Sequence, residues 1–205
     1  MIKLIKFILI FIAVLAFSFW PSGASFAQDL SVYRNPSAEN RVPLSLEQQK
    51  PTAKTLQNTL VELIDLNRAA KQAHWNVEGP LFYELHILLD EFVEDYRQDS
   101  DIVAERLLAI HHSADGRPKV VSQTAQLPVF PEGFLNDYEV LDVLSQRLNT
   151  VTHRLRDRIN TLDDLDLVSQ DVLIEVERDL AEHLWMLREF QQQNALNSTS
   201  PIQAS

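Results

Sequence analysis

The chain has 205 residues, enough for one domain with a sizeable core, and it contains no cysteine. The missing thiols exclude disulfides, thiolate metal sites and cysteine nucleophiles. With 29 acidic against 18 basic residues, the formal net charge at pH 7 is −11, and no basic cluster offsets it. Such a surface repels nucleic acid and anionic lipid, and it attracts cations.

Residues 1–27 have the parts of a secretory signal peptide. Lys3 and Lys6 form a basic start, residues 7–20 are an apolar run too short for a comfortable membrane span, and small residues precede a cleavage point before Gln28. The alternative is an uncleaved N-terminal anchor. We expect an exported protein of the periplasm or an equivalent extracytoplasmic compartment, in contact with the membrane only through this segment. Cleavage would take the net charge to −13, because two lysines and no acids are lost.

A polar arm and a first helix follow. Residues 28–50 are polar and predict an extended N-terminal arm. The first helix is predicted from Pro51, because the missing N–H of a proline is spare in the first turn of a helix. Leucines and alanines of helical period continue to Gly79 and Pro80, which together predict its end.

Three more long helices are predicted from apolar stripes of helical period, over residues 81–113, 137–162 and 168–192. The connection 114–136 is rich in proline and glycine, with one short helix expected over residues 120–127, and its length would let it cross from one end of a bundle to the other. Residues 194–205 predict a disordered tail. The predicted fold class is all-α, a ferritin-like four-helix bundle over residues 51–193.

Candidate metal ligands lie around the junction of the first two helices. His74 ends the first helix, while His86, Asp101 and Glu105 follow on the second, a set that suits a redox-active metal such as iron. On one continuous helix His86 and Asp101 are roughly 22 Å apart, too far for one ion. Either there are two sites, or two chains pair antiparallel so that the histidines of one meet the carboxylates of the other.

The acids can be interpreted in two ways. Asp101 and Glu105 are one turn apart and can clamp a cation together, and Asp90 is one turn after His86. The alternative is a solvated helix face, the usual fate of charged residues. His111, His112 and His153 lack such a context and are interpreted as ordinary helix residues.

These residues carry a resemblance to the Dps family (DNA-binding proteins from starved cells), which are small ferritins. The similarity is dense over residues 60–108 and weaker over 178–185. It rests on Lys71-Gln72-Ala73-His74-Trp75-Asn76-Val77, Gly79-Pro80, Leu85-His86, Asp90-Glu91 and Asp101-Ile102-Val103-Ala104-Glu105-Arg106.

The resemblance implies a homo-oligomer, a dodecameric hollow shell with ferroxidase sites between two-fold-related subunits. His74 and His86 would come from one subunit, Asp101 and Glu105 from its neighbour, and Asp90 would lie beside them. Trp75 would be the aromatic residue next to the site; its alternative role is packing in the core, and the two roles are compatible. Fe²⁺ would be oxidised by hydrogen peroxide, or by oxygen, and stored as a ferric mineral.

Four further positions follow from the resemblance. Three acids, Asp164, Asp166 and Asp171, align with a three-fold pore, with helix capping as the alternative. His183 replaces a position that is often apolar in the family. It is either an added metal ligand, which would raise the affinity for zinc, or a surface histidine.

The chain departs from the family in its arm, which has no net charge. It contains three basic and three acidic residues, namely Arg34, Arg41 and Lys50, and Asp29, Glu39 and Glu47. Many members bind DNA through a lysine-rich tail, so DNA binding is not expected here, and DNA protection ranks as an alternative only. Two more hypotheses compete with iron oxidation. One is a protein that buffers zinc or another divalent ion without catalysis, and the second is a structural or adhesive surface protein that uses the shell as a scaffold.

Overall fold

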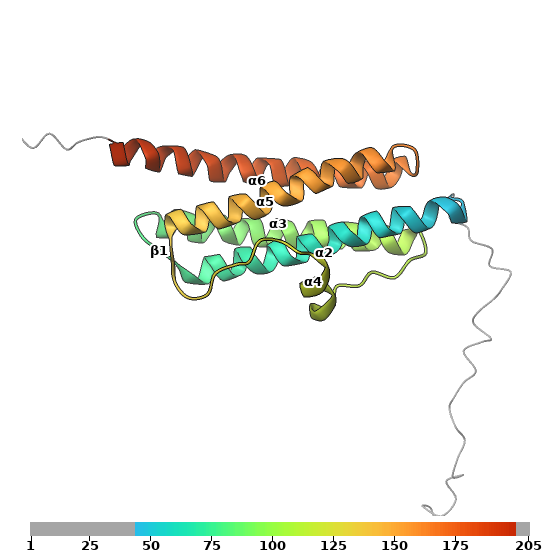
Figure 1. Cartoon of the computed structure of the whole chain (residues 1–205), viewed down its shortest axis with the longest axis horizontal. Helices are drawn as coiled ribbons and strands as arrows, with labels where there is room; N and C mark the ends of the chain where they lie inside the picture. Colours follow the sequence, from blue (N-terminus) through green and yellow to red (C-terminus); the bar gives the residue numbers. More distant parts are fainter. Residues whose placement is uncertain (1–43, 200–205) are drawn as a thin grey trace, which may run out of the picture. The chain divides into compact units, whose positions relative to one another are not determined.

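The computed structural model describes residues 44–199, with side chains as far as residue 192. The predicted signal peptide and most of the predicted arm lie outside these residues. Within them the chain forms four long helices, one short helix and two strands of two residues each, which confirms the all-α bundle (Figure 1). None of the described helices is long and apolar enough to cross a membrane.

The first helix, α2 (Leu46–Asn76), begins five residues before the predicted start at Pro51. Ser45 and Gln48 form a capping box, in which the Ser45 hydroxyl accepts the Gln48 N–H at 3.3 Å and the Gln48 side chain accepts the Ser45 N–H at 3.2 Å. Pro51 therefore lies inside the helix, and the boundary predicted for the arm at residue 50 is wrong.

The second helix, α3 (Phe82–Ala109), ends before the predicted Ser113. His111 adopts a left-handed backbone conformation with φ 64°. The N–H groups of His111 and His112 donate to the carbonyls of Leu108 and Leu107, both at 2.9 Å. This is the Schellman pattern that usually requires glycine, here closed with a histidine. It gives His111 and His112 a structural role at the end of α3.

The second half of the bundle follows the predicted pattern with shifted ends. The short helix α4 (Pro118–Thr124) begins earlier than predicted, with proline in its first turn. Helix α5 (Asp137–Leu162) has the predicted bounds and a capping box between Asn136 and Glu139. Helix α6 (Leu167–Thr199) runs past the predicted end, so the expected tail from residue 194 is helical as far as Thr199.

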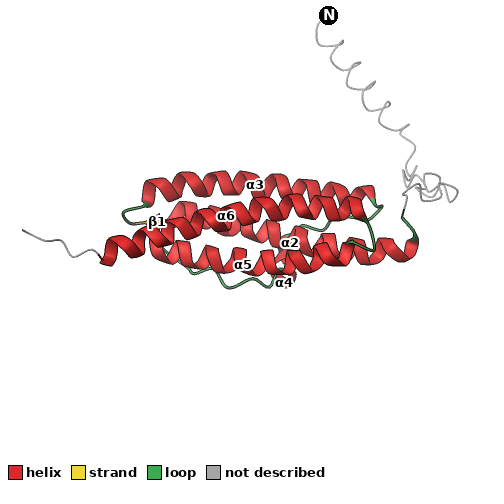
Figure 2. Cartoon of the chain, turned by 90° about the horizontal axis from the view of Figure 1, so that it is seen from above, coloured by secondary structure: helices red, strands yellow, loops and turns green. Residues whose placement is uncertain are grey.

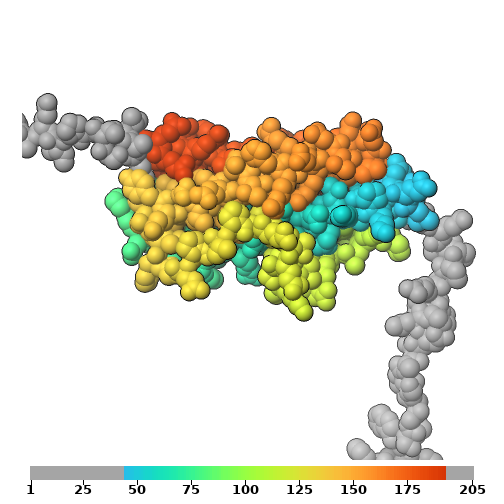
Figure 3. Space-filling model, viewed as in Figure 1, coloured from blue at the N-terminus to red at the C-terminus, as the bar shows by residue number. Residues whose placement is uncertain are grey.

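Two helical hairpins build the bundle: α2 packs along α3, and α5 packs along α6 (Figures 1 and 2). The hairpins meet through α2 against α5 and α3 against α6, around a leucine- and valine-rich core. The connection after α3 carries α4 along the outside of α2, where it stands out from the bundle (Figure 3). It then returns to the other end of the bundle, where α5 begins, as its length predicted.

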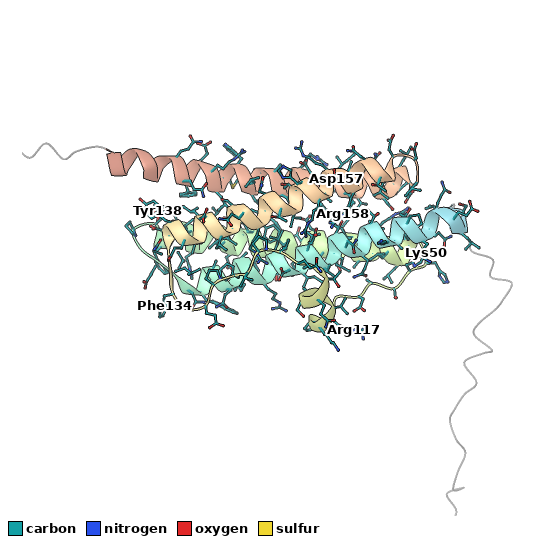
Figure 4. All side chains as sticks on the ribbon, viewed as in Figure 1. Lys50, Arg117, Phe134, Tyr138, Asp157 and Arg158 are labelled. Carbon is teal, nitrogen blue, oxygen red and sulfur yellow. The ribbon has the colours of Figure 1, made fainter. Side chains whose placement is uncertain are left out.

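Charged pairs join the two hairpins across the interior. Glu62 of α2 is buried and is held by Arg154 and Arg158 of α5, at 2.8 and 2.5 Å (Arg158 is labelled in Figure 4). Asp65 pairs with the buried Arg147 at 2.5 Å. Removing one partner of such a pair would leave a buried charge uncompensated, so these contacts fix how α2 lies against α5.

A short parallel ladder ties the α2–α3 turn to the start of α5. In it β1 (Val77–Glu78) pairs with β2 (Leu135–Asn136), Val77 opposite Leu135. The following Gly79 has φ 123°, and a Cβ there would meet the Asp137 carboxylate at 3.0 Å. Asp137 is buried and accepts the N–H of Leu81 at 3.1 Å. The close approach of Asp137 thus positions the first residues of α3.

Replacing Gly79 by alanine is expected to lower the free energy of unfolding by about 1–3 kcal/mol, because the backbone conformation is unfavourable for an L side chain. The crowding at Asp137 should add to this loss. Urea unfolding at fixed protein concentration measures it. Gly133→Ala is the matched control, since Gly133 also has a positive φ but open space around it. Equal losses in the two variants would show that the contact with Asp137 contributes nothing.

Candidate metal centre

Two histidine rings face each other across the α2–α3 turn. His74 lies in the last turn of α2 and is buried, whereas His86 lies near the start of α3 and is half-buried. Their ring centroids are 3.7 Å apart and the planes differ by 20°, so the imidazoles are stacked. The turn through β1 and Gly79 therefore brings together two residues that are 12 positions apart in the sequence.

Each histidine is oriented by the backbone of the other. Nδ1 of His74 lies 2.7 Å from the carbonyl oxygen of His86, and Nδ1 of His86 lies 2.8 Å from that of His74. Because a carbonyl can only accept, Nδ1 must be the protonated nitrogen in both rings. In the neutral form of each ring the lone pair is then on Nε2, which is the arrangement of metal-binding histidines whose second nitrogen is fixed by a hydrogen bond.

Acidic side chains border this pair. A cavity of about 360 Å³ is lined by His74, His86, Ile87, Asp90, Glu91 and Glu94. Asp90 accepts a hydrogen bond from Lys71 at 2.5 Å, which lowers the pKa of its carboxyl. Hydrogen bonds from Arg97 and Gln98 lower the pKa of Glu94 to about 2. Both carboxylates are thus ionised at neutral pH. Glu94 was not predicted, although its place one turn after Asp90 could have indicated it.

Asp101 and Glu105 lie far from the histidines. Both are exposed on the later part of α3, which is one continuous helix, so Asp101 is roughly 22 Å from His86. Among residues 44–199, no three histidine or acidic side chains are grouped closely enough to hold an ion. One chain by itself therefore presents a histidine pair and, separately, a carboxylate pair.

Trp75 follows His74 directly, but its side chain is 63 % exposed, so the alternative that it packs in the core of the subunit is wrong. The Lys71 ammonium lies 6.0 Å from the centre of its ring. Large apolar side chains are also exposed on α3, namely Phe82, Tyr83, Ile87, Ile102 and Leu108. Exposed apolar side chains in such numbers are typical of a surface that another chain covers.

Comparison with known proteins identifies the fold. Residues 53–196 match the Ferritin family, described as a ferritin-like domain. The chain is 36 % identical to DNA protection during starvation protein 2 of Deinococcus radiodurans, over 83 % of this chain and 72 % of that one. It is also similar to the crystal structure of Dps92 from Deinococcus radiodurans, with 38 % identity and a TM-score of 0.69 over 70 % of this chain and 87 % of the other.

The chain belongs to the Dps family. Membership supports an iron-storage mini-ferritin that works as a homo-oligomer. A further relative has another name: the fine tangled pili major subunit of Haemophilus ducreyi is 32 % identical over 82 % of this chain and 88 % of its own.

The three predicted pore acids have different surroundings in this Dps chain. Asp164 and Asp171 are exposed. Asp166 instead caps α6, accepting the Ser169 N–H at 3.2 Å, and pairs with Arg106 at 2.6 Å. Burial opposes the charge on Asp166, but the bonds from Ser169 and Arg106 outweigh it and lower the pKa. For Asp166 the capping alternative describes the structure.

His183 is not a surface residue, since its side chain is buried between α3 and α6. Its ring stacks on Phe92 with centroids 3.9 Å apart, and Nε2 lies 3.1 Å from Asp95. Its contacts on α3 are with Phe92 and Asp95, which project from another face of that helix than His86 does.

Asp166→Asn is expected to destabilise the subunit by about 1–2 kcal/mol at pH 7, because the negative charge that pairs with Arg106 and faces the start of α6 is lost. A carboxyl with a lowered pKa contributes stability above its unfolded-state pKa, near 3.8, and loses it as the pH falls through the folded-state value. The difference from the parent should therefore shrink below about pH 4. Thermal unfolding between pH 3 and 7 measures this.

The exposed Asp164→Asn is the matched control and should change stability by less than about 0.5 kcal/mol at either pH. If both variants behaved alike across the pH range, the charge of Asp166 would not stabilise the start of α6.

Proposed function

We propose that the chain is a ferroxidase subunit of a dodecameric shell that oxidises Fe²⁺ and stores the ferric product. The observation that carries this is the His74–His86 pair, whose reciprocal bonds leave both Nε2 atoms free to bind a metal. Among residues 44–199 of its own chain, the pair has no carboxylate ligands in suitable positions. Asp101 and Glu105 supply two such ligands on the same helix, at a distance that only a second subunit can close.

Two-fold pairing would complete the site. In an isologous dimer, if a residue i of one subunit contacts a residue j of the other, then residue j of the first also contacts residue i of the second. A two-fold axis that passes α3 midway between His86 and Asp101 would therefore place the histidines of each subunit beside the carboxylates of the other, which gives two identical sites. The exposed apolar residues near both ends of α3 would be covered by the same contact. Trp75 would then be enclosed beside the histidines, where it could take up stray oxidising equivalents.

The chemistry requires no charge on the histidines. Neutral imidazoles and ionised carboxylates bind Fe²⁺ and favour Fe³⁺, the harder and more highly charged ion. Two ferrous ions each give one electron to hydrogen peroxide, the O–O bond breaks, and two hydroxide ions form, so no hydroxyl radical is released. Asp90 would add a further carboxylate once it parts from Lys71. The net charge of −11 favours the entry of cations, and Asp164 and Asp171 stay as candidates for a pore.

Subunit complementation tests the site. His74→Ala/His86→Ala and Asp101→Ala/Glu105→Ala oligomers should each lose rapid Fe²⁺ oxidation by hydrogen peroxide. After joint unfolding and 1:1 reassembly, half of the dimers would be mixed, and each of these would hold one intact site of two. About a quarter of the parent rate should return, followed as ferric absorbance and peroxide loss.

Two results would contradict the proposal in different ways. If the His74→Ala/His86→Ala oligomer and the Asp101→Ala/Glu105→Ala oligomer both still oxidised Fe²⁺ rapidly, these residues would not be the ferroxidase site. Loss without any recovery in the mixed oligomer, with shells of normal size, would place both halves of the site in one subunit. His153→Ala is the control for loss of an exposed histidine on another helix.

A second candidate function is a scaffold at the cell surface, favoured by the similarity to the pilus subunit. Binding to a surface would then be lost in assembly-disrupting variants but kept in His74→Ala. A zinc-buffering role would be favoured if zinc were bound at His74 and His86 while iron-dependent peroxide consumption was absent. Binding to DNA is not proposed, and a mobility shift at low salt would reverse that view.

We also propose export through residues 1–27, which lie outside the described residues and whose composition alone supports this. Mass spectrometry of the protein purified from a native host should find a chain beginning at Gln28, in the periplasmic or extracellular fraction. A full-length chain that begins at Met1 and stays in the cytoplasm would contradict export. A full-length chain in the membrane fraction would favour the uncleaved anchor.

A further inference from the structure

A second group of possible ligands lies between α3 and α6, away from the His74–His86 pair. Its centre is His183, whose side chain is only 5 % exposed. The ring is held on two sides, by stacking on Phe92 and by the edge of Tyr96 at 5.2 Å between centroids. A histidine packed in this way has no freedom to turn to solvent, so its nitrogens must find partners inside the bundle.

The polar needs of His183 are only half met. Nε2 lies 3.1 Å from Asp95, but the buried Nδ1 has no hydrogen-bond partner among the described residues. Burial lowers the pKa of His183 in spite of the nearby Asp95, Asp179 and Glu182 carboxylates. The ring is therefore a neutral imidazole beside several negative charges, which is the protonation state that binds metals.

Asp99 adds a second buried group without a partner. It lies one turn after Asp95, is 3 % exposed, and its Oδ2 accepts no hydrogen bond from the described part of the chain. A carboxylate left in such a position is costly unless a proton or a cation compensates it.

The groups form two facing pairs with helical spacing. Asp95 and Asp99 on α3 are four residues apart, as are Asp179 and His183 on α6, so each pair projects from one side of its helix. Among residues 44–192, no lysine or arginine forms an ion pair with these three acids. A cavity of about 290 Å³, bounded in part by Asp95, Asp179, Glu182 and His183, opens beside them.

We propose that this group, the α3–α6 cluster, binds one divalent transition-metal ion of the zinc and ferrous class. Nε2 of His183 and the carboxylates of Asp95 and Asp179 would be the ligands, and Asp99 would supply charge or a fourth oxygen. One nitrogen with several oxygens suits such ions better than it suits calcium or magnesium. The ion would replace the hydrogen bond between Nε2 and Asp95, and the proton would move to Nδ1.

The side chains do not yet surround one point, since no three such groups among residues 44–199 are close enough to hold an ion. His183 is fixed and already contacts Asp95, whose carboxylate is 45 % exposed and can rotate toward a bound ion. Asp95 lies nine residues after His86, roughly 13 Å along α3, and on the side that faces α6. None of its proposed ligands is a proposed ferroxidase ligand, although Asp99 lies two residues before Asp101 and Glu91 lines both this cavity and the one at the histidines.

Calorimetric titration of the metal-free, assembled full chain with Zn²⁺ tests the cluster. His183→Gln and, separately, Asp179→Asn should weaken one class of sites at least about tenfold and leave the class at His74 and His86 unchanged. His153→Gln is the matched control, because it removes an exposed histidine outside the cluster, and it should leave both classes unchanged. Co²⁺ absorption should lose the corresponding band in His183→Gln.

Zinc titrations unchanged in both His183→Gln and Asp179→Asn would overturn the cluster. So would equal weakening in His153→Gln. Should His183→Gln fail to assemble, Asp179→Asn alone decides, since Asp179 is only half-buried. The His74→Ala/His86→Ala oligomer separates the two proposals: if it keeps rapid iron oxidation while His183→Gln loses a zinc site, the ferroxidase assignment fails and the cluster stands.

Discussion

The reciprocal bonds between His74 and His86 are the constraint around which the candidate site is organised. Each Nδ1–H donates a hydrogen bond to a backbone carbonyl of the opposite helix. The carbonyl of His74 lies in the last turn of α2 and would otherwise have no partner within the helix. The same two contacts therefore cap a helix, join α2 to α3 and fix the tautomer of both rings. A ligand pair built in this way is oriented before any metal arrives.

Charge is distributed differently on the two sides of the bundle. Between α2 and α5 the interior acids are matched, with Glu62 held by Arg154 and Arg158, and Asp65 by Arg147. Along the described length of α3, the acids at the candidate metal positions have no arginine partner; Asp101, for example, is solvated, and Asp99 is buried with one oxygen unpaired. The first arrangement stabilises the fold, whereas the second leaves negative charge for cations to neutralise.

The sequence predicted what depends on local pattern. Apolar periodicity located all four long helices, and the ends of α5 were placed correctly because capping and breaking signals flank it. The predicted start of α2 is wrong because a proline such as Pro51 is typical of a first turn, whereas the helix begins at the capping box of Ser45 and Gln48. The end of α3 was missed because a histidine, in place of glycine, closes its Schellman turn.

Contacts between distant residues could not be predicted in the same way. The stacking of His74 on His86 depends on a turn whose geometry needs Gly79 beside Asp137, 58 residues later. The burial of His183 depends on which face of α6 meets Phe92 and Tyr96, and its apolar setting is invisible in the sequence around it. Spacing along α3 did carry one long-range conclusion, since a rigid helix separates His86 from Asp101 by a distance that a single ion cannot bridge. One subunit orients the histidine ligands His74 and His86 but leaves the carboxylate ligands Asp101 and Glu105 exposed elsewhere on its surface. The two halves can form one metal site only when a second subunit brings its carboxylates to the histidines of the first.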